Sequence, residues 1–174
     1  MGLYSLVLLA HSWLRWAVLL LALALLARSA AGWLRSRAWT PADERLQVAL
    51  VAVIDLELLL GLLLYLALSP LTRAFLAHPA AGMRAPALRF FGVEHGLAML
   101  LAVAVAHAGR VISRRAPTPA RRQRVTCITA LLVLLLLAAA IPWPVLGYGR
   151  PLFRRADLAP GARWAAGLLY QSLI

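Results

Sequence analysis

The sequence contains a single cysteine, Cys127, and no lysine, so that all 18 of its basic residues are arginine. One cysteine excludes an internal disulfide, a thiolate metal site and the covalent attachment of a c-type haem. Any haem would therefore be held without covalent bonds to the chain. The N-terminus also lacks a basic region and a small-residue cleavage site, so the first apolar run predicts a retained helix and not a cleaved signal peptide.

Acidic residues are scarce as well: six of them stand against 18 arginines, which gives a formal net charge of +12. In a soluble protein this excess would suggest nucleic acid. Here 63% of the residues are hydrophobic, the mean hydropathy is +0.83, and the arginines flank apolar runs. Arginines at the ends of membrane helices keep the adjoining loops in the cytoplasm and contact anionic lipid headgroups. These roles explain the positive charge, so we expect no nucleic-acid partner.

Four apolar segments are long enough to cross a bilayer, because about 20 residues span the roughly 30 Å of hydrocarbon. They are residues 3–27, 46–68, 86–108 and 125–143. A backbone in lipid must satisfy its own hydrogen bonds, and these segments show no period-two alternation, so they predict helices. The fold class expected is an all-α membrane protein. Its predicted partner is the lipid bilayer.

One four-helix transmembrane domain is predicted for residues 1–145, and residues 146–174 form a tail. The tail is too short and too interrupted to span again, so we expect an interfacial segment with Trp164 and Tyr170 at headgroup level. Ten arginines lie in the first and third connections, against seven in the second connection and the tail. Loop arginines stay in the cytoplasm, which places both termini outside a bacterial inner membrane.

Ionisable residues inside membrane helices are costly, usually face the bundle interior and mark functional sites. Seven fall within the predicted spans and require an explanation. They are His11, Arg15, Asp55, Glu57, Glu94, His95 and His107.

His11 and His95 are predicted to lie at the same depth. At 1.5 Å per residue, His11 is ~12 Å below the outer end of the first helix and His95 ~13 Å below the outer end of the third. Two imidazoles at one level could bind opposite faces of a flat cofactor, as in a bis-histidine haem b. The alternative is that both histidines only donate hydrogen bonds across the bundle.

Arg15 stands one helical turn below His11 on the same face, so we expect it to meet an acidic group in the interior. That group is either a haem propionate or one of two carboxylates in the second helix. Asp55 and Glu57 project from nearly opposite sides of that helix, so only one of them should reach Arg15. The sequence favours Glu57, because Glu57, Gly61 and Tyr65 share one face.

Three further residues have competing interpretations. His107 lies ~18 Å beyond His95, near the cytoplasmic end, where a headgroup-facing role is the simpler expectation and Asp55 is the nearest candidate partner. Glu94 is expected to form a structural pair, with Arg89 as one partner, or to accept protons. Met99, one turn below His95, is expected to pack in the core or against a haem edge.

Several motifs together resemble a group of small four-helix bacterial membrane proteins labelled cytochrome b or cytochrome b-like. The motifs follow one another along nearly the whole chain. They are HSWLRW, TPADERL, IDLELLLGLLLYLALSP, RFFGVEHGLAMLLAVAVAHAGR, AAAIPWP and RPLF. The resemblance implies haem b and electron transfer, with His11 and His95 as axial ligands.

The chain departs from that family pattern in the second helix, where relatives often have histidine and glutamine in place of Asp55 and Glu57. A second haem site that used His107 and such a histidine would therefore be missing here. The resulting expectation is an electron carrier or redox subunit, more than a stand-alone enzyme, that exchanges electrons with a quinone or a redox partner subunit.

A second class of protein stays open: a cofactor-free transporter or assembly subunit in which Arg15, Asp55, Glu57 and Glu94 form an ion-pair or proton-relay network. A scaffold whose polar residues only fix the helix register is the third interpretation. The sequence also leaves open whether the chain forms a homo-oligomer.

Overall fold

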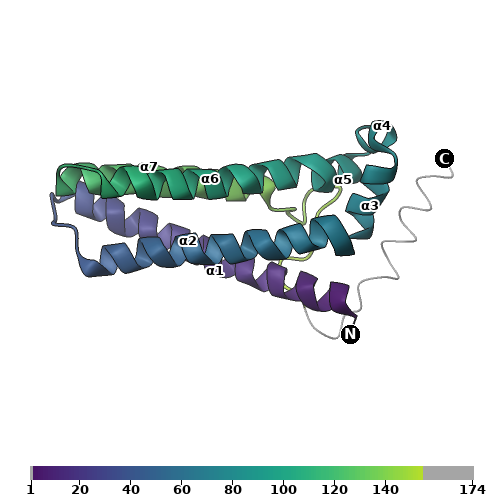
Figure 1. Ribbon diagram of the computed structural model, residues 1–174, viewed down its shortest axis with the longest axis horizontal. Coiled ribbons are helices and arrows are strands. Elements are labelled where there is room, and N and C mark those ends of the chain that lie inside the picture. Colours follow the sequence, from purple (N-terminus) through teal and green to yellow (C-terminus); the bar gives the residue numbers. More distant parts are fainter. Residues whose placement is uncertain (1, 155–174) are drawn as a thin grey trace.

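The computed structural model describes residues 2–154 and contains four helical spans, each long and apolar enough to cross a membrane (Figure 1). The first is α1, Leu3–Leu34. The second is α2, Pro41–Leu63, continued by the π-helical segment η1, Leu64–Leu68. The third comprises α5, Pro86–Arg89, the π-helical segment η2, Phe90–Glu94, and α6, His95–Arg114. The fourth is α7, Pro119–Ala140.

The prediction of an all-α, four-helix membrane protein is confirmed, while several helix ends differ from the expected ones. α1 continues to Leu34 and α6 to Arg114, so both helices extend beyond the apolar runs that defined them. α7 ends at Ala140, ahead of the predicted residue 143, because a proline at 142 restricts the residue before it to extended conformations. The second and third spans are joined by α3, Pro70–Ala77, and α4, Pro79–Gly82.

The starts of α2 and α7 follow from their capping residues. The Thr40 side chain accepts a hydrogen bond from the backbone N–H of Asp43, and the Asp43 side chain accepts one from the backbone of Thr40, which completes a capping box. Thr118 accepts in the same way from the backbone N–H of Arg121. A proline at the first helical position supports both starts.

The contacts between the four spans place α1 and α6 on one diagonal of the bundle, with α2 and α7 on the other. We name the end that contains the start of α1 and the end of α7 the terminal end. The opposite end, where residues 35–40 and 115–118 connect the helices, is the loop end. The diagonal placement means that inward side chains of α1 and α6 meet across the centre of the bundle.

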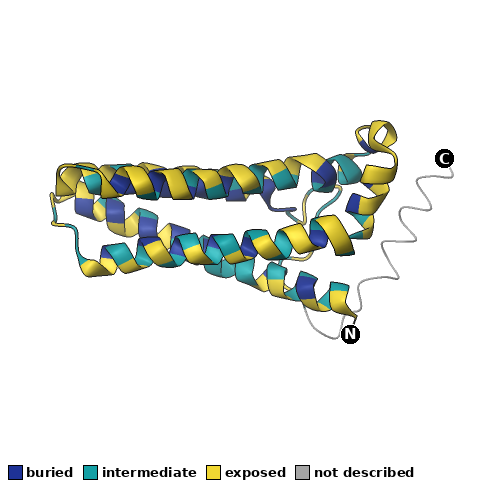
Figure 2. Cartoon of the chain, in the orientation of Figure 1, coloured by how far each residue is buried: buried dark blue, intermediate teal, exposed yellow. Residues whose placement is uncertain are grey.

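The core lies nearest α7, which is the most enclosed of the four spans. Figure 2 shows that buried positions face the inside of the bundle and exposed positions its outer surface. Of its most apolar stretch 44% is buried, against 22% for the corresponding stretch of the second span. Val133 and Ala130 of α7 are fully buried and pack with Val18 and Ala22 of α1. The core of the bundle is therefore built on the contacts that α7 makes with its neighbours α1 and α6.

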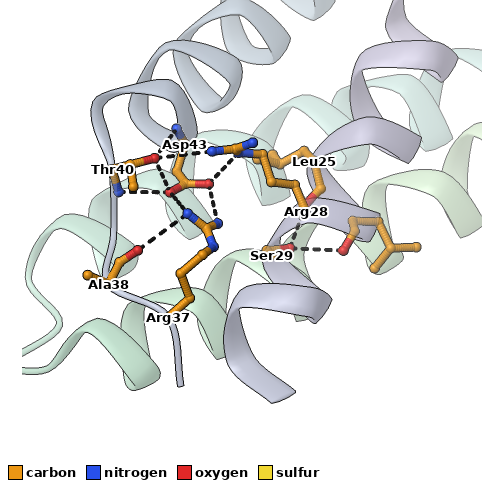
Figure 3. A network of polar contacts seen from close by, with 8 residues as sticks. Leu25, Arg28, Ser29, Arg37, Ala38, Thr40 and Asp43 are labelled. Carbon is orange, nitrogen blue, oxygen red and sulfur yellow. Dashed lines mark hydrogen bonds and ion pairs between the residues drawn. The ribbon is translucent and has the colours of Figure 1, made fainter. Parts of the chain in front are cut away.

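Asp43 organises the loop end (Figure 3). Its carboxylate accepts from Arg28 Nε at 2.6 Å and from Arg37 Nη2 at 2.8 Å, and it also accepts from the Thr40 hydroxyl. The hydrogen bond to Asp43 raises the pKa of the Arg37 guanidinium above its ordinary value. Nearby, Glu44 pairs with Arg110 and Arg122. The loop end is thereby cross-linked by charge-assisted hydrogen bonds that involve all four spans.

Below this charged layer a second polar layer is buried within the bundle. Gln47 Nε2 donates to the Thr126 hydroxyl at 3.3 Å, and the Ser113 and Thr126 hydroxyls are 2.9 Å apart. Gly109 packs so closely on Thr129 that a Cβ atom there would overlap the threonine side chain. Hydrogen bonds between small polar side chains and close backbone approach are typical of helix contacts in membranes.

Candidate functional site

His11 of α1 and His95 of α6 face each other across the centre of the terminal end. Their ring centroids lie 6.2 Å apart and the ring planes are inclined at 83°. The side chain of His11 is 15% exposed, and His95 is half-buried. The structure thus brings together the two histidines that the sequence predicted to be level.

A cavity of about 310 Å³ opens beside this pair, between α2 and α6. Its volume is at the lower end of the range found for small-molecule and cofactor sites. The leucines that flank its mouth, Leu97 and Leu100, are about half exposed on the outer surface of α6, where the bilayer would contact them. The polar and small residues of its lining are His11, Glu57, Gly61, Tyr65, Gly92, His95 and Gly96.

The Nδ1 atoms of both histidines face an acceptor. His95 Nδ1 lies 2.8 Å from the carbonyl oxygen of Ala140, and since a carbonyl only accepts, Nδ1 carries the proton and Nε2 keeps its lone pair. His11 Nδ1 lies 3.2 Å from Glu57 Oε1, within ion-pair distance but outside hydrogen-bond geometry. The carboxylate favours a proton on Nδ1 of His11 as well, which leaves Nε2 available to a metal.

At this site a buried carboxylate lacks a hydrogen bond among the described residues, and two glycines border the cavity. Glu57 is buried, and its Oε2 has no hydrogen-bond partner in the described part of the chain. A Cβ atom added to Gly61 would stand 3.3 Å from Cε1 of His11, and one added to Gly96 would find only Tyr65, at 3.9 Å. The two glycines therefore leave space where α2 and α6 approach the histidines.

Both π-helical segments lie at this site. The hydroxyl of Tyr65 in η1 donates to the carbonyl oxygen of Gly92 in η2 at 2.7 Å, and the Thr72 hydroxyl donates to the Tyr65 carbonyl oxygen at 2.8 Å. Gly92 has no Cβ to clash with the ring of Phe75, which packs against it. Single π turns within α-helices are frequent at functional sites. Sequence reasoning missed them, since hydrophobic periodicity does not register one extra residue per turn.

Arg15 does not pair with Asp55 or Glu57 as expected. Its Nη2 donates to the carbonyl oxygen of Leu152 at 2.8 Å, and Trp16 Nε1 donates to the same oxygen at 3.1 Å. Trp13 Nε1 donates to the carbonyl oxygen of Arg154 at 3.1 Å, and the ring of Phe153 stacks on that of Trp16. The motif HSWLRW therefore holds the chain after α7 against α1, because free backbone carbonyls there need donors.

The start of the tail differs from its prediction for the same reason. The first tail residues were expected to lie at the interface, yet the segment up to residue 154 runs back to α1 within the terminal end (Figure 1). Trp164 and Tyr170, the aromatic residues predicted at headgroup level, lie outside the described residues.

Two carboxylates expected in the bundle interior, those of Asp55 and Glu94, lie on its surface. His107 Nε2 lies 2.9 Å from Asp55 Oδ1, with side chains that are 51% and 41% exposed. The interior assignment of Asp55 was wrong, whereas the exposed position of His107 agrees with the headgroup-facing role expected for it. Glu94 is exposed too, and its pairing with Arg89, at 2.6 Å, is confirmed. Met99 lines the cavity, as expected for a residue one turn from His95.

In comparisons with known proteins, no protein-family model, no curated protein and no solved structure matches the chain. Residues 2–154 also contain no group of three or more histidine, cysteine, aspartate or glutamate side chains arranged to hold a metal ion. The arrangement that the described residues do present is a pair of facing imidazoles beside an apolar cavity.

Proposed function

We propose that the protein is a membrane-embedded haem b electron-transfer protein with one haem between His11 and His95. The observation that carries the proposal is the facing pair of imidazoles, on diagonal helices, beside a cavity of about 310 Å³. In four-helix bundles, cofactor sites are built from inward side chains on facing helices. The resemblance of HSWLRW and RFFGVEHGLAML to cytochrome b-like proteins points the same way.

The spacing of the two rings supports this assignment. Two metal–nitrogen bonds of about 2 Å each would place the centroids of two imidazoles roughly 6 Å apart, and the separation here is 6.2 Å. Gly61 and Gly96 keep the adjoining faces of α2 and α6 open. The donor set of two neutral imidazoles with no further ligand suits haem iron better than a zinc or copper ion.

The bound haem would supply one-electron chemistry, and the chain sets the conditions for it. The Ala140 carbonyl fixes the tautomer and ring orientation of His95 through Nδ1. The buried carboxylate of Glu57, facing His11, stabilises positive charge at the centre and so lowers the reduction potential. Met99 and the aliphatic lining exclude water from the site.

The partner that fits this site is a lipid-soluble quinone or a redox subunit within the membrane. The cavity lies between α2 and α6 and is bordered by exposed leucines, so an apolar donor could approach from the bilayer. Arginines are more numerous at the loop end, and we place that end in the cytoplasm of a bacterial cell, with the histidine pair toward the outer face of the inner membrane.

The cofactor-free alternative is the weaker proposal. A transporter or assembly subunit built on a buried ion-pair network would connect Arg15 to the acidic residues. Arg15 instead donates to the Leu152 carbonyl, while Asp55 pairs with His107 at the surface. No ion pair among the described residues joins Arg15 to Glu57.

A reduced-minus-oxidised visible spectrum of the purified protein tests the proposal. We expect a low-spin haem b spectrum in the wild type, its loss in His11→Ala and in His95→Ala, and its retention in His78→Ala, which removes an exposed histidine of the α3–α4 connection. A folded wild type that stays colourless after haem is added would refute the proposal. So would a His11→Ala variant with an unchanged spectrum.

A further inference from the structure

The chain after α7 carries an arginine into a second, smaller cavity on the terminal side of the histidine pair. This cavity has a volume of about 80 Å³ and shares His11, His95, Gly61 and Tyr65 with the larger one. Besides the apolar side chains of Leu8, Leu64 and Phe91, its remaining lining contains one cation and three residues with hydroxyl groups. These residues are Arg150, Tyr4, Ser69 and Thr72.

Arg150 is held at this place by contacts on both sides. Its backbone N–H donates to the carbonyl oxygen of Pro142 at 2.9 Å, and its guanidinium stands 4.5 Å from the ring centroid of Phe91. Two residues later, the Leu152 carbonyl receives hydrogen bonds from Arg15 and Trp16. The HSWLRW motif of α1 therefore fixes the segment that presents Arg150.

Positive charge accumulates around this cavity. Burial, together with the positive charge of Arg150, lowers the pKa of the Arg154 guanidinium. Arg15 Nε is buried without a hydrogen-bond partner, and none of the ion pairs among residues 2–154 involves Arg15 or Arg154. Neighbouring half-buried cations repel one another, so an anion at this end would stabilise them.

We propose that the smaller cavity receives the propionate carboxylates of the haem and that Arg150 is their principal cationic partner. This inference rests on the proposed function and replaces Arg15, the propionate partner considered from the sequence. Both cavities adjoin the same two histidines, so one flat molecule can extend from the larger cavity into the smaller one. Its charged edge then meets Arg150 and the hydroxyl groups, and its apolar edge meets the leucines.

Comparing the binding of haem b with that of its dimethyl ester tests this assignment, because the ester keeps the iron and the ring but lacks both negative charges. Absorbance titration of the haem-free protein gives the two dissociation constants. We expect the wild type to bind haem b roughly tenfold more tightly than the ester, since hydrogen bonds to charged groups are the strong ones.

In Arg150→Gln the ratio of the two dissociation constants should fall to near unity, because haem b binds more weakly while binding of the ester is unchanged. Arg150→Lys should keep part of the preference for haem b. Arg89→Gln is the matched control, because Arg89 lies at the same end but pairs with Glu94 on the surface; it should keep the full preference. The wild-type comparison needs no variant, so it stands even if Arg150→Gln fails to fold.

Equal affinity of the wild type for haem b and the ester would overturn the inference while leaving the haem proposal intact. An Arg150→Gln variant that weakens both ligands equally would also overturn it, since Arg150 would then only shape the site. The alternative anion for Arg150 is the phosphate of a phospholipid. In that case the ester will bind as tightly as haem b, and added anionic lipid will displace neither of them. This outcome would contradict the inference. Binding of neither porphyrin would remove the proposed function and this inference together.

Discussion

The two ends of one helix bundle are built in opposite ways. At the loop end, Asp43, Glu44 and Gln47 place polar groups against partners on α1, α6 and α7. At the terminal end, the helices change to π geometry in η1 and η2, and a cavity separates α2 from α6. The difference indicates that stability resides at the loop end and that the terminal end is shaped to receive a ligand.

The largest expected effect on stability comes from Asp43. Asp43→Ala removes the acceptor shared by Arg28, Arg37 and the Thr40 cap, and we expect the free energy of unfolding to fall by about 3 kcal/mol. Unfolding in mixed micelles measures this change. Haem content per folded chain should not change; a selective loss of haem without loss of stability would contradict the division between the two ends.

Two glycines of α6 sharpen the same comparison. Gly109→Ala drives a Cβ into the Thr129 side chain, and overpacking of this kind should destabilise the protein by about 2 kcal/mol. Gly96→Ala, beside the cavity, meets only Tyr65 at 3.9 Å and should change stability by less than about 0.5 kcal/mol. The same unfolding assay compares them, and equal losses would mean that the terminal end is as tightly packed as the loop end.

Glu57 and Asp55 form a matched pair for the redox properties. Glu57→Gln removes a buried negative charge that faces His11, so the midpoint potential should rise by tens of millivolts. Asp55→Asn, whose side chain is half exposed and pairs with His107, should leave the potential nearly unchanged. Potentiometric titration of both variants measures this, and a larger shift in Asp55→Asn would reverse the assignment.

The smallest effect is expected from Trp16. Trp16→Phe keeps an aromatic ring against Phe153 but removes the N–H that donates to the Leu152 carbonyl, a hydrogen bond worth about 1 kcal/mol. Global stability should hardly change. Trypsin should cleave after Arg154 somewhat faster than in the wild type, and unchanged cleavage would show that this bond does not hold the segment.

Local features of the sequence were sufficient to predict the spans and the level of the histidine pair. The number of spans and the common level of His11 and His95 depend on the length of the apolar runs and on the rise per residue. The partner of Arg15 could not be predicted, because it is a backbone carbonyl more than a hundred residues away. Likewise, whether His107 faces inward depends on the rotation of α6, which contacts between helices set.

The measurement that tests the central claim most directly is the number of haem b groups per purified chain in the wild type, His95→Ala and His107→Ala. A ligand site confined to the terminal end predicts one haem in the wild type, none in His95→Ala and one in His107→Ala. Two haems in the wild type, or a haem that depends on His107, would show that the loop half of the bundle also binds a cofactor. That result would contradict the division of the molecule into a stabilising end and a binding end.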